Sequence, residues 1–342
     1  MIAVVTGSTG FIGSHLVDAL LARGADVRAL YRPETSRHRR DPRAEPYEVD
    51  LLDDRALRSS KVWHDATHVF HLAGVTRGRR LAHFRAGNVD PTVNLLAALA
   101  AYAGGTPRIV LVSSQAAAGP ASAPDAPVRE SDSPRPVEPY GQSKLEAEQA
   151  LLRYPALGAT VVRPAAVYGP RDRDFLHAFR QAAGRIALFA APRDQLFSIV
   201  HVSDLVRAIL LAGDEPAARG HRYFVGNDEP TTWRALYAAI AAAAGAHPRT
   251  IQLPLGGLRI GAALMDAVAL VTGRTFLASR ARIALANPRW WLCDSSRART
   301  ELGWRAEVAL NEGVRDTYLS YLSAGWMRAP RADAAPSKEM RV

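Results

Sequence analysis

Cysteine and lysine are scarce in this sequence. Among its 342 residues there is one cysteine, Cys293, and lysine occurs only at positions 61, 144 and 338. One cysteine cannot form an internal disulfide, and no Cys or His stands beside it at the spacing of a metal site. We therefore expect no bound metal and a reducing, cytoplasmic compartment. The scarcity of lysine also makes Lys144 conspicuous.

Long uninterrupted apolar segments are absent as well. The most apolar later stretch, residues 255–272, is broken by Arg259 and Asp266. This favours an amphipathic helix in a cap over a helix on a membrane surface, and it argues against a bilayer span. Met1 leads directly into Ile2 and a strand-like run without a basic segment, so we expect no secretory signal. Hydrophobic residues make up 48% of the chain, which excludes a wholly disordered protein.

A shortage of acidic residues leaves a formal net charge of +10. Such an excess can serve nucleic acid, an anionic membrane or an anionic cofactor, or it can reflect compositional bias. The arginines that carry it are scattered and no nucleic-acid-binding motif accompanies them, so we expect no nucleic-acid partner. One local cluster is formed by Arg32, Arg37, Arg39, Arg40 and Arg43.

The hydrophobic pattern of the first half predicts an α/β protein. Short apolar runs alternate with helical patterns, which is typical of a Rossmann-type, doubly wound parallel sheet with right-handed crossovers. We expect strands at residues 2–6, 26–31, 46–49, 68–72, 108–113 and 160–163, and helices at 11–23, 91–103 and 143–153.

The pattern becomes irregular after about residue 165, with one further strand expected at 197–202 and several alanine-rich helices. We expect a dinucleotide-binding domain at residues 1–168 with a returning segment at about 198–226. Residues 169–197 and 227–326 would form a smaller, mostly helical substrate-binding cap. Residues 327–342 mix Pro, Ala and charge without periodicity, so we expect a disordered tail there.

A glycine-rich turn joins the first predicted strand to the first predicted helix, in the sequence Gly7-Ser8-Thr9-Gly10-Phe11-Ile12-Gly13. A dinucleotide pyrophosphate binds helical N–H groups at such a place. Gly7 permits the tight turn, Gly10 lets the backbone approach the phosphate, and Gly13 lets helix and sheet pack closely. The motif therefore predicts a dinucleotide site.

The end of the second predicted strand bears on the choice of cofactor. Sites that prefer NAD place an acidic residue there, about 20 residues past the glycines, to hold the ribose hydroxyls. This chain has Arg32 instead, and a guanidinium can bind a 2′-phosphate in bidentate fashion. The sequence favours NADP(H) over NAD(H), with a solvated loop arginine as the alternative.

Tyr140 and Lys144 stand four residues apart at the beginning of a predicted helix, so both face the same side. A tyrosine with a pKa of about 10 is a poor base at neutral pH, but a nearby ammonium and a positively charged nicotinamide would stabilise its phenolate. Ser113 and Ser114 end a predicted strand, at the edge where ligands bind in open parallel sheets. We expect Ser114 to orient a substrate oxygen, Tyr140 to exchange the proton and Lys144 to hold the nicotinamide ribose.

In combination these motifs resemble the extended short-chain dehydrogenases/reductases, the family of sugar-nucleotide epimerases and dehydratases, 3β-hydroxysteroid dehydrogenases and dihydroflavonol-type reductases. The resemblance covers roughly residues 1–325. It rests on residues 6–13, 50–51, 71–74, 88–92, 113–114 with Gly119, 140–144, 163–170 and 201–205.

The resemblance implies that Asp50 and Leu51 flank the adenine, that Pro164 to Val167 contact the nicotinamide, and that Asp204 is structural. A homodimer built by two helices of each subunit is expected from the resemblance alone. Together with the glycine turn and Arg32, the expected cofactor site comprises Gly7, Thr9, Gly10, Phe11, Ile12, Arg32, Asp50, Leu51, Leu72, Ala73, Gly74, Asn88, Val112, Ser113, Tyr140, Lys144, Pro164, Ala165 and Val167.

Departures from the family's patterns bear on the substrate. Sugar-nucleotide dehydratases carry an Asp-Glu pair after the catalytic hydroxyl residue, whereas this chain has Gln115-Ala116. Many nucleotide-sugar epimerases carry an Arg just before the equivalent of His201, whereas residues 196–200 here are uncharged. We therefore expect hydride transfer at a secondary alcohol or ketone of a small or apolar substrate, with residues 255–286 either lining an apolar pocket or packing as ordinary core.

Two alternatives remain open at this point. One is a sugar-nucleotide epimerase with tightly bound NAD, which would oxidise its substrate and reduce it again on the other face. The other is a non-catalytic sensor that binds NADP on the same fold. The intact set of Ser114, Tyr140 and Lys144 argues against the sensor, because sensing does not require a proton relay.

Overall fold

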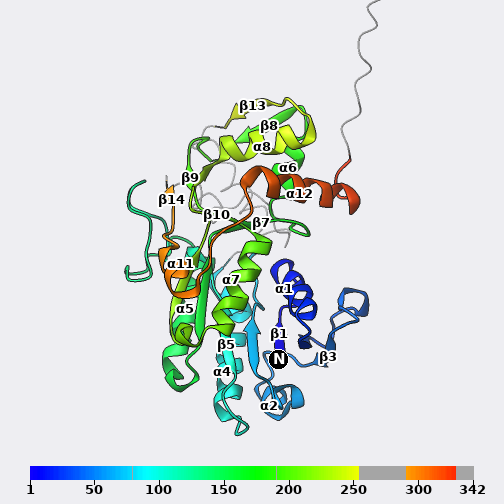
Figure 1. Cartoon of the computed structure of the whole chain (residues 1–342), viewed down its shortest axis with the longest axis vertical. Coiled ribbons are helices and arrows are strands. Elements are labelled where there is room, and N and C mark those ends of the chain that lie inside the picture. Colours follow the sequence, from blue (N-terminus) through cyan, green and yellow to red (C-terminus); the bar gives the residue numbers. More distant parts are fainter. Residues whose placement is uncertain (79, 190, 254–289, 329–342) are drawn as a thin grey trace, which may run out of the picture.

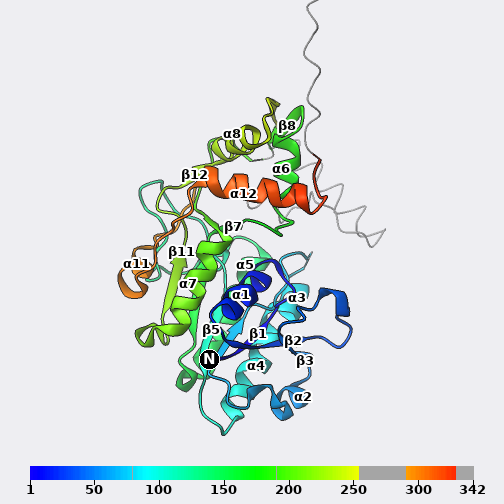
Figure 2. The same cartoon turned by 45° about the vertical axis from the view of Figure 1, so that its right-hand side comes forward.

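The structure is a computed structural model that describes residues 1–78, 80–189, 191–253 and 290–328. The helix and pocket lining expected within 255–286 lie outside the described residues, as does all but the start of the expected tail. Figures 1 and 2 show a sheet with its covering helices in the lower part of the view, and a smaller layer of helices and short strands above it.

The main sheet has seven parallel strands in the order β11-β6-β5-β4-β1-β2-β3. The chain proceeds outward from β1 in both directions, so the sheet is doubly wound and the predicted fold class is confirmed. Six strands match their predictions to within one residue, whereas β11 was not predicted. The bounds are β1 Ile2–Thr6, β2 Asp26–Tyr31, β3 Glu45–Glu48, β4 His68–His71, β5 Arg108–Val112, β6 Thr160–Pro164 and β11 Arg222–Val225.

Helices cover both faces of this sheet. They are α1 Phe11–Ala22, α2 Asp54–Ser59, α3 Leu81–Phe84, α4 Asp90–Ala101, α5 Pro139–Ala150, α7 Val202–Asp214 and α11 Ser296–Leu302, with 3-10 turns at Arg37–Arg39, Lys61–Trp63, Gln115–Ala117, Leu151–Arg153, Pro155–Leu157 and Pro216–Ala218 and a π-helical turn at Arg85–Val89. Because side chains alternate along a strand, Ala3 and Val5 of β1 enter a core with α1, α7 and α11, and Val4 enters a second core with α2, α4 and α5.

The start of α5 corrects a predicted boundary. We expected this helix at 143–153, but it begins at Pro139 and ends at Ala150. Proline is favoured in the first helical turn because its missing N–H is not needed there. The Glu138 carboxylate caps the helix by accepting hydrogen bonds from the Tyr140 amide at 2.7 Å and the Gly141 amide at 2.5 Å. These two residues therefore fix the turn that carries Tyr140.

A second layer lies above the carboxyl ends of the strands (Figure 1). Its core includes Phe179, Phe189, Leu236, Ile240 and Tyr321, all buried. Its elements are α6 Leu176–Ala182, α8 Trp233–Ala244 and α12 Leu310–Ser323, with the strand pairs β7 Ala166–Tyr168 and β10 Ile199–His201, β8 Ile186–Phe189 and β13 Arg249–Gln252, and the three-stranded sheet of β9 Leu196–Phe197, β12 Thr231–Thr232 and β14 Trp290–Trp291.

The single strand expected at 197–202 is wrong, because it is divided at Ser198 into β9 and β10, which belong to different sheets. The Ser198 amide donates to the Trp291 carbonyl at 2.8 Å, and the Ser198 carbonyl accepts from the Ala166 amide at 3.3 Å. Ser198 thus forms hydrogen bonds to both sheets. An apolar run in the sequence does not by itself reveal that the strand is divided at this residue. The last predicted strand residue, Val202, begins α7.

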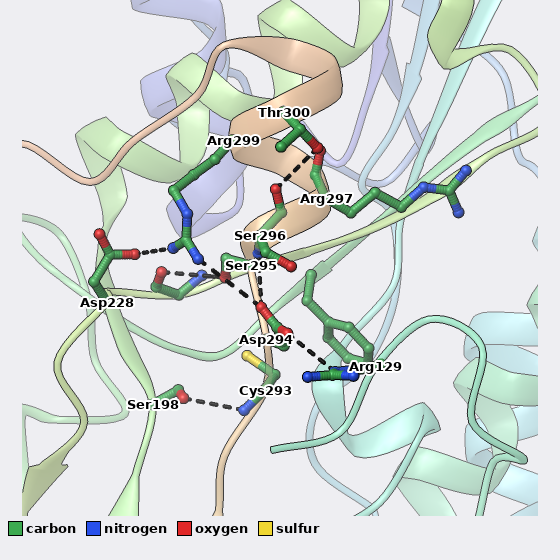
Figure 3. Close-up of polar contacts among 12 residues, drawn as sticks. Arg129, Ser198, Asp228, Cys293, Asp294, Ser295, Ser296, Arg297, Arg299 and Thr300 are labelled. Carbon is green, nitrogen blue, oxygen red and sulfur yellow. Dashed lines mark hydrogen bonds and ion pairs between the residues drawn. The ribbon is translucent and has the colours of Figure 1, made fainter. Parts of the chain in front are cut away.

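Segments far apart in the sequence meet beside β11 and α11 (Figure 3). The Asp294 carboxylate accepts from the Ser296 amide at 2.8 Å and from Arg129 at 3.2 Å, and Arg299 forms an ion pair with Asp228. The Ser295 hydroxyl bonds both the amide and the carbonyl of Gly226, at 3.0 and 3.2 Å. These contacts fasten the end of β11 to the chain that leads into α11.

The part of the chain described here contains no helix that is both long and apolar enough to cross a membrane.

Asp204 in α7 joins this helix to the following loop. Its side chain is 1% exposed, pairs with Arg207 at 3.0 Å, and accepts from the amides of Glu307 and Val308 at 3.1 and 3.0 Å. Its carbonyl also accepts from the Trp304 indole at 2.8 Å. The structure therefore agrees with the expectation that Asp204 is structural.

We expect Asp204→Ala to lower the free energy of unfolding by about 3 kcal/mol, because two part-buried amides and Arg207 lose the buried carboxylate that accepts from them. The control is Asp214→Ala on the same helix, whose surface pair with Arg23 is worth at most about 1 kcal/mol. Urea denaturation of both variants measures the difference. Equal losses would contradict the structural role of Asp204.

Candidate active site

The turn after β1 is shaped to receive an anion. Gly7 has a φ of +71°, and a Cβ there would lie 2.7 Å from the Ala73 amide nitrogen, so only glycine fits. Helix α1 begins at Phe11 with Gly10 as its N-cap, and no described side chain caps its first amides. The Ser8 hydroxyl in the same turn is buried and lacks a partner among the described residues. These free donors suit the phosphates of a dinucleotide.

A chain of buried hydrogen bonds connects β1 to the region of the site. His71 Nδ1 lies 2.7 Å from the Thr6 hydroxyl and His71 Nε2 lies 3.0 Å from the Thr92 hydroxyl. Burial, aided by the charge of Lys144, lowers the pKa of His71 to about 3, so its ring is neutral. The Thr92 hydroxyl donates to the Asn88 carbonyl at 2.7 Å, which leaves it to accept from Nε2. Sequence reasoning assigned no role to His71.

Asn88 lies in the π-helical turn Arg85–Val89, a distortion that is frequent at functional sites. Its amide oxygen accepts from the Val75 amide at 2.7 Å, and its amide nitrogen donates to the Val75 carbonyl at 3.1 Å and to the Ser143 hydroxyl at 2.8 Å. The side chain, which we expected beside the cofactor, is thus used to hold the loop after β4 against α5.

Tyr140 and Ser114 are brought together by a close backbone approach. The Ser114 side chain accepts from the Ala116 amide at 3.1 Å and lies near enough to the Tyr140 phenol to lower its pKa by hydrogen bonding. A Cβ at position 141 would collide with the Ala116 carbonyl, so Gly141 allows α5 to lie against the turn that follows β5. Phe84 packs edge-on against the Tyr140 ring, with centroids 6.0 Å apart.

Burial dominates the pKa of Tyr140. It raises that pKa to about 12, and the charges of Glu138 and Asp174 act in the same direction. The hydrogen bond from Ser114 acts in the opposite direction. The protein's own groups therefore favour the protonated phenol. The expected effect of Lys144 together with a bound nicotinamide stays a prediction.

Lys144 follows Tyr140 by one turn of α5 and is 7% exposed. Its Nζ donates to the Val112 carbonyl at 2.8 Å, at the end of β5. Burial lowers the pKa of Lys144 to about 8, and the carboxylate of Glu148 one turn further on opposes this shift. The amine is thus anchored at the carboxyl end of the sheet, where ligands bind in such folds.

A buried ion pair lies one helical turn beyond Lys144. Arg163 of β6 is bidentate to Glu148, with Nε at 2.9 Å and Nη2 at 2.6 Å, and both side chains are at most 2% exposed. The Ser113 hydroxyl donates to the same carboxylate at 2.5 Å. Ser113, which we expected to contact the cofactor, is committed to this pair. In the sequence, the available sign that Glu148 belongs to this region was its position four residues after Lys144, on the same face of the helix.

The remaining predicted cofactor residues differ in burial and in their contacts. The Ala73 amide donates to the Thr6 hydroxyl at 3.1 Å, and the Asp50 carboxylate accepts from the Leu52 amide at 3.0 Å. Leu51, Leu72 and Val167 are partly buried, Gly74 is exposed, Pro164 ends β6, and Ala165 is buried. Arg32 is exposed, with its Nε 3.4 Å from Glu34.

A pocket of about 330 Å³ opens beside the glycine turn. Arg32 does not line it, whereas other members of the arginine cluster do. Its lining comprises Ser8, Thr9, Ser14, Val17, Asp18, Arg39, Arg40, Asp41, Pro42, Arg43 and Arg171. Four arginines face two aspartates, so the pocket suits an anion.

Among the described residues no group of three or more His, Cys, Asp or Glu side chains is arranged to hold a metal ion.

Comparison with known proteins places this geometry in a family. The profile of the NAD dependent epimerase/dehydratase family matches residues 3–226. A ceramide reductase of Caulobacter vibrioides is 31% identical, over 95% of this chain and 96% of its own. A UDP-glucose 4-epimerase of Mycolicibacterium smegmatis is also 31% identical, over 93% and 97% of the two chains.

Solved structures agree. The crystal structure of a UDP-glucose 4-epimerase of Thermus thermophilus in complex with NAD superposes with a TM-score of 0.74 at 26% identity, covering 95% of this chain and 100% of the other. Named relatives are thus both reductases and epimerases. The chain belongs to the NAD-dependent epimerase/dehydratase family and is an NAD(P)-dependent enzyme of the extended short-chain dehydrogenase/reductase type.

Proposed function

We propose that the protein is an oxidoreductase that transfers a hydride at a secondary alcohol or ketone of a small or apolar substrate. The observation that carries this proposal is the close approach of the start of α5 to the turn after β5, which brings Tyr140 near enough to Ser114 for the serine to lower its pKa, with Lys144 one turn away on the same helix and anchored at the end of β5. The uncapped amides of α1 and the partnerless Ser8 hydroxyl fit a dinucleotide at the neighbouring turn.

The residues act on the proton while the nicotinamide, when bound, supplies or accepts the hydride. In ketone reduction, Tyr140 donates its phenolic proton to the substrate oxygen, and in alcohol oxidation the phenolate takes that proton back. Ser114 orients the substrate oxygen and stabilises the phenolate by its hydrogen bond. Lys144 holds the ribose hydroxyls from its place beside the Val112 carbonyl.

An apolar substrate is supported by the chain's own residues. Strands β9 and β10 before His201 carry no charge, and Gln115-Ala116 replaces the acidic pair of the dehydratases. One relative at 31% identity is a ceramide reductase. We propose that α6, β8, α8 and α12, which share their own hydrophobic core, form the substrate-binding cap together with β13, which pairs with β8.

A sugar-nucleotide epimerase is the second candidate, because relatives and solved neighbours include UDP-glucose 4-epimerases. In that case the cofactor stays bound and the substrate is oxidised and then re-reduced. Turnover of a UDP-sugar without net change in nicotinamide absorbance would favour it over the reductase. A non-catalytic NADP sensor is disfavoured because the Tyr140–Ser114 pair is assembled.

We also propose that NADP(H) is preferred to NAD(H). Arg39, Arg40 and Arg43 line the pocket beside Ser8 and Thr9, and the end of β2 carries Arg32 where an NAD-selective site has a carboxylate. Asp41 and Asp18 pair with Arg43, and Glu48 pairs with Arg40. Arg39 is exposed and has no partner among the described residues, so it can bind a phosphate at little cost.

A homodimer through α4 and α5 is our proposal for assembly. A shallow pocket of about 490 Å³ lies between these helices and includes Val93, Glu146 and Arg153. We further propose a cytoplasmic location, because the one cysteine is a free, buried thiol and the chain can form no internal disulfide.

We expect Tyr140→Phe to lower kcat by about 10²- to 10⁴-fold, because the proton donor is lost. Dinucleotide affinity should stay unchanged. The control is Tyr154→Phe, a partly buried tyrosine outside the site. Ketone reduction followed by nicotinamide absorbance, with a panel of apolar ketones, measures both variants. Full activity of Tyr140→Phe would refute the assigned chemistry.

The pH dependence of alcohol oxidation tests Ser114. Its hydrogen bond lowers the pKa of Tyr140, so Ser114→Ala should raise that pKa further. Oxidation needs the phenolate, so its rate falls as the pH drops below that pKa, and this acidic limb should move to higher pH. Reduction needs the protonated phenol and should persist to higher pH. The exposed Ser59→Ala serves as control. A lower rate with an unmoved limb would argue against this role.

We expect Arg39→Ala to weaken NADPH binding by about tenfold and to leave NADH binding unchanged, because one charge-assisted contact to the 2′-phosphate is lost. The matched control is Arg55→Ala, another exposed arginine far from the pocket. Titration calorimetry gives both dissociation constants. Equal or tighter NADH binding by the unaltered protein would end the NADP preference.

A further inference from the structure

An apolar stripe is exposed at the tip of the second layer, on strands β8 and β13. Among the described residues, eight large hydrophobic side chains are conspicuously exposed, and three of them lie here: Ile186 at 53%, Leu188 at 38% and Ile251 at 46%. Figures 1 and 2 both show β8 and β13 at the end of the molecule opposite α2 and β3. We call residues 185–188 with 249–251 the cap tip.

The three side chains point to the same side of this two-stranded sheet. Ile186 and Leu188 alternate with the buried Ala187 and Phe189, so they share the outer face. Leu188 is paired with Ile251 in the parallel register, which places both on that face. A contiguous outward stripe of this kind marks an interaction site more often than scattered single residues do.

Positive charge surrounds the stripe without any acidic residue in its own elements. Arg249 is paired with Ile186 across the sheet, and Arg185 is the residue just before Ile186, where β8 begins. Neither guanidinium has a partner among the described residues. Residues 176–189 and 233–252, which cover α6, β8, α8 and β13, contain no Asp or Glu. The nearest acid in the following loop, Asp194, is already paired with Arg234.

We propose that the cap tip docks on an anionic phospholipid surface. Aliphatic side chains enter the boundary between headgroups and acyl chains, while arginines beside them contact the phosphates. A second copy of this chain fits less well, because Arg185 and Arg249 would face like charges. A nucleic acid would use the arginines but has no use for an aliphatic stripe. The proposal goes beyond the hydride transfer and does not depend on it.

Vesicle co-sedimentation of the full chain tests this surface. We expect binding to vesicles of phosphatidylglycerol and phosphatidylcholine, weakened by added salt, and little binding to phosphatidylcholine alone. Each arginine near such a surface contributes about fivefold in affinity, so Arg185→Glu with Arg249→Glu should reduce binding at least about 25-fold. Ile186→Ser with Ile251→Ser should reduce binding as well.

Matched controls lie on the other part of the molecule. Arg55→Glu and Leu152→Ser alter an exposed arginine and a leucine that is 69% exposed, and both should bind vesicles like the unaltered protein. Circular dichroism and NADPH binding report whether each variant is folded. Equal losses in the tip and control variants, or binding to duplex DNA as tight as to anionic vesicles, would overturn the proposal.

A label at the stripe separates lipid from other occupants. The one native cysteine is buried, so Leu188→Cys directs an environment-sensitive fluorophore to the tip. In buffer we expect the fluorescence emission that is typical of a polar environment. When anionic vesicles are added, it should change to the emission typical of an apolar environment. Apolar emission before vesicles are added would show that another part of the molecule, or a second copy, already covers the stripe, and the proposal would fail.

Discussion

The contact between the start of α5 and the turn after β5 is the constraint on which the site depends. Gly141 lies so close to the Ala116 carbonyl that any side chain there would force the helix away. Because Pro139 and the Glu138 carboxylate set where the helix begins, the same contact determines how far Tyr140 stands from Ser114. Catalytic groups lose efficiency when they are misplaced by about 1 Å, so backbone proximity here has a direct chemical effect.

Two polar networks stabilise that arrangement from either side. The bonds from Thr6 through His71 and Thr92 to Asn88 join the sheet to the helix layer, and Asn88 continues them to Ser143 of α5. On the other side, Glu148 receives Arg163 and Ser113. Burying an ion pair costs desolvation that its attraction only partly offsets, so its value here lies in fixing α5 against β5 and β6.

Much of the sheet could be predicted because its strands are short apolar runs between helical patterns, as in β1 and β2. The glycine turn and the four-residue spacing of Tyr140 and Lys144 also indicated the site from the sequence. We placed the start of α5 too late because the hydrogen bonds by which Glu138 caps the helix before Pro139 are seen only in the folded structure. Likewise, the division at Ser198 depends on Trp291, which is distant in sequence. The pKa of Tyr140 depends on burial, and the arginines of the pocket depend on how the loop after β2 folds back, which no local pattern reveals.

The junction at the end of β11 has a consequence for how the chain acquires its structure during synthesis. Gly226 is held by Ser295, which lies 69 residues later, and Glu130 accepts from the Phe224 amide across 94 residues. When β11 is synthesised Glu130 is already present, but the residue beyond its end lacks Ser295 until a further 69 residues have been made. Contacts of such long range slow folding and leave strand edges open to aggregation in the interval. The edge of the sheet is thus fastened late, by Ser295, which lies outside the sheet.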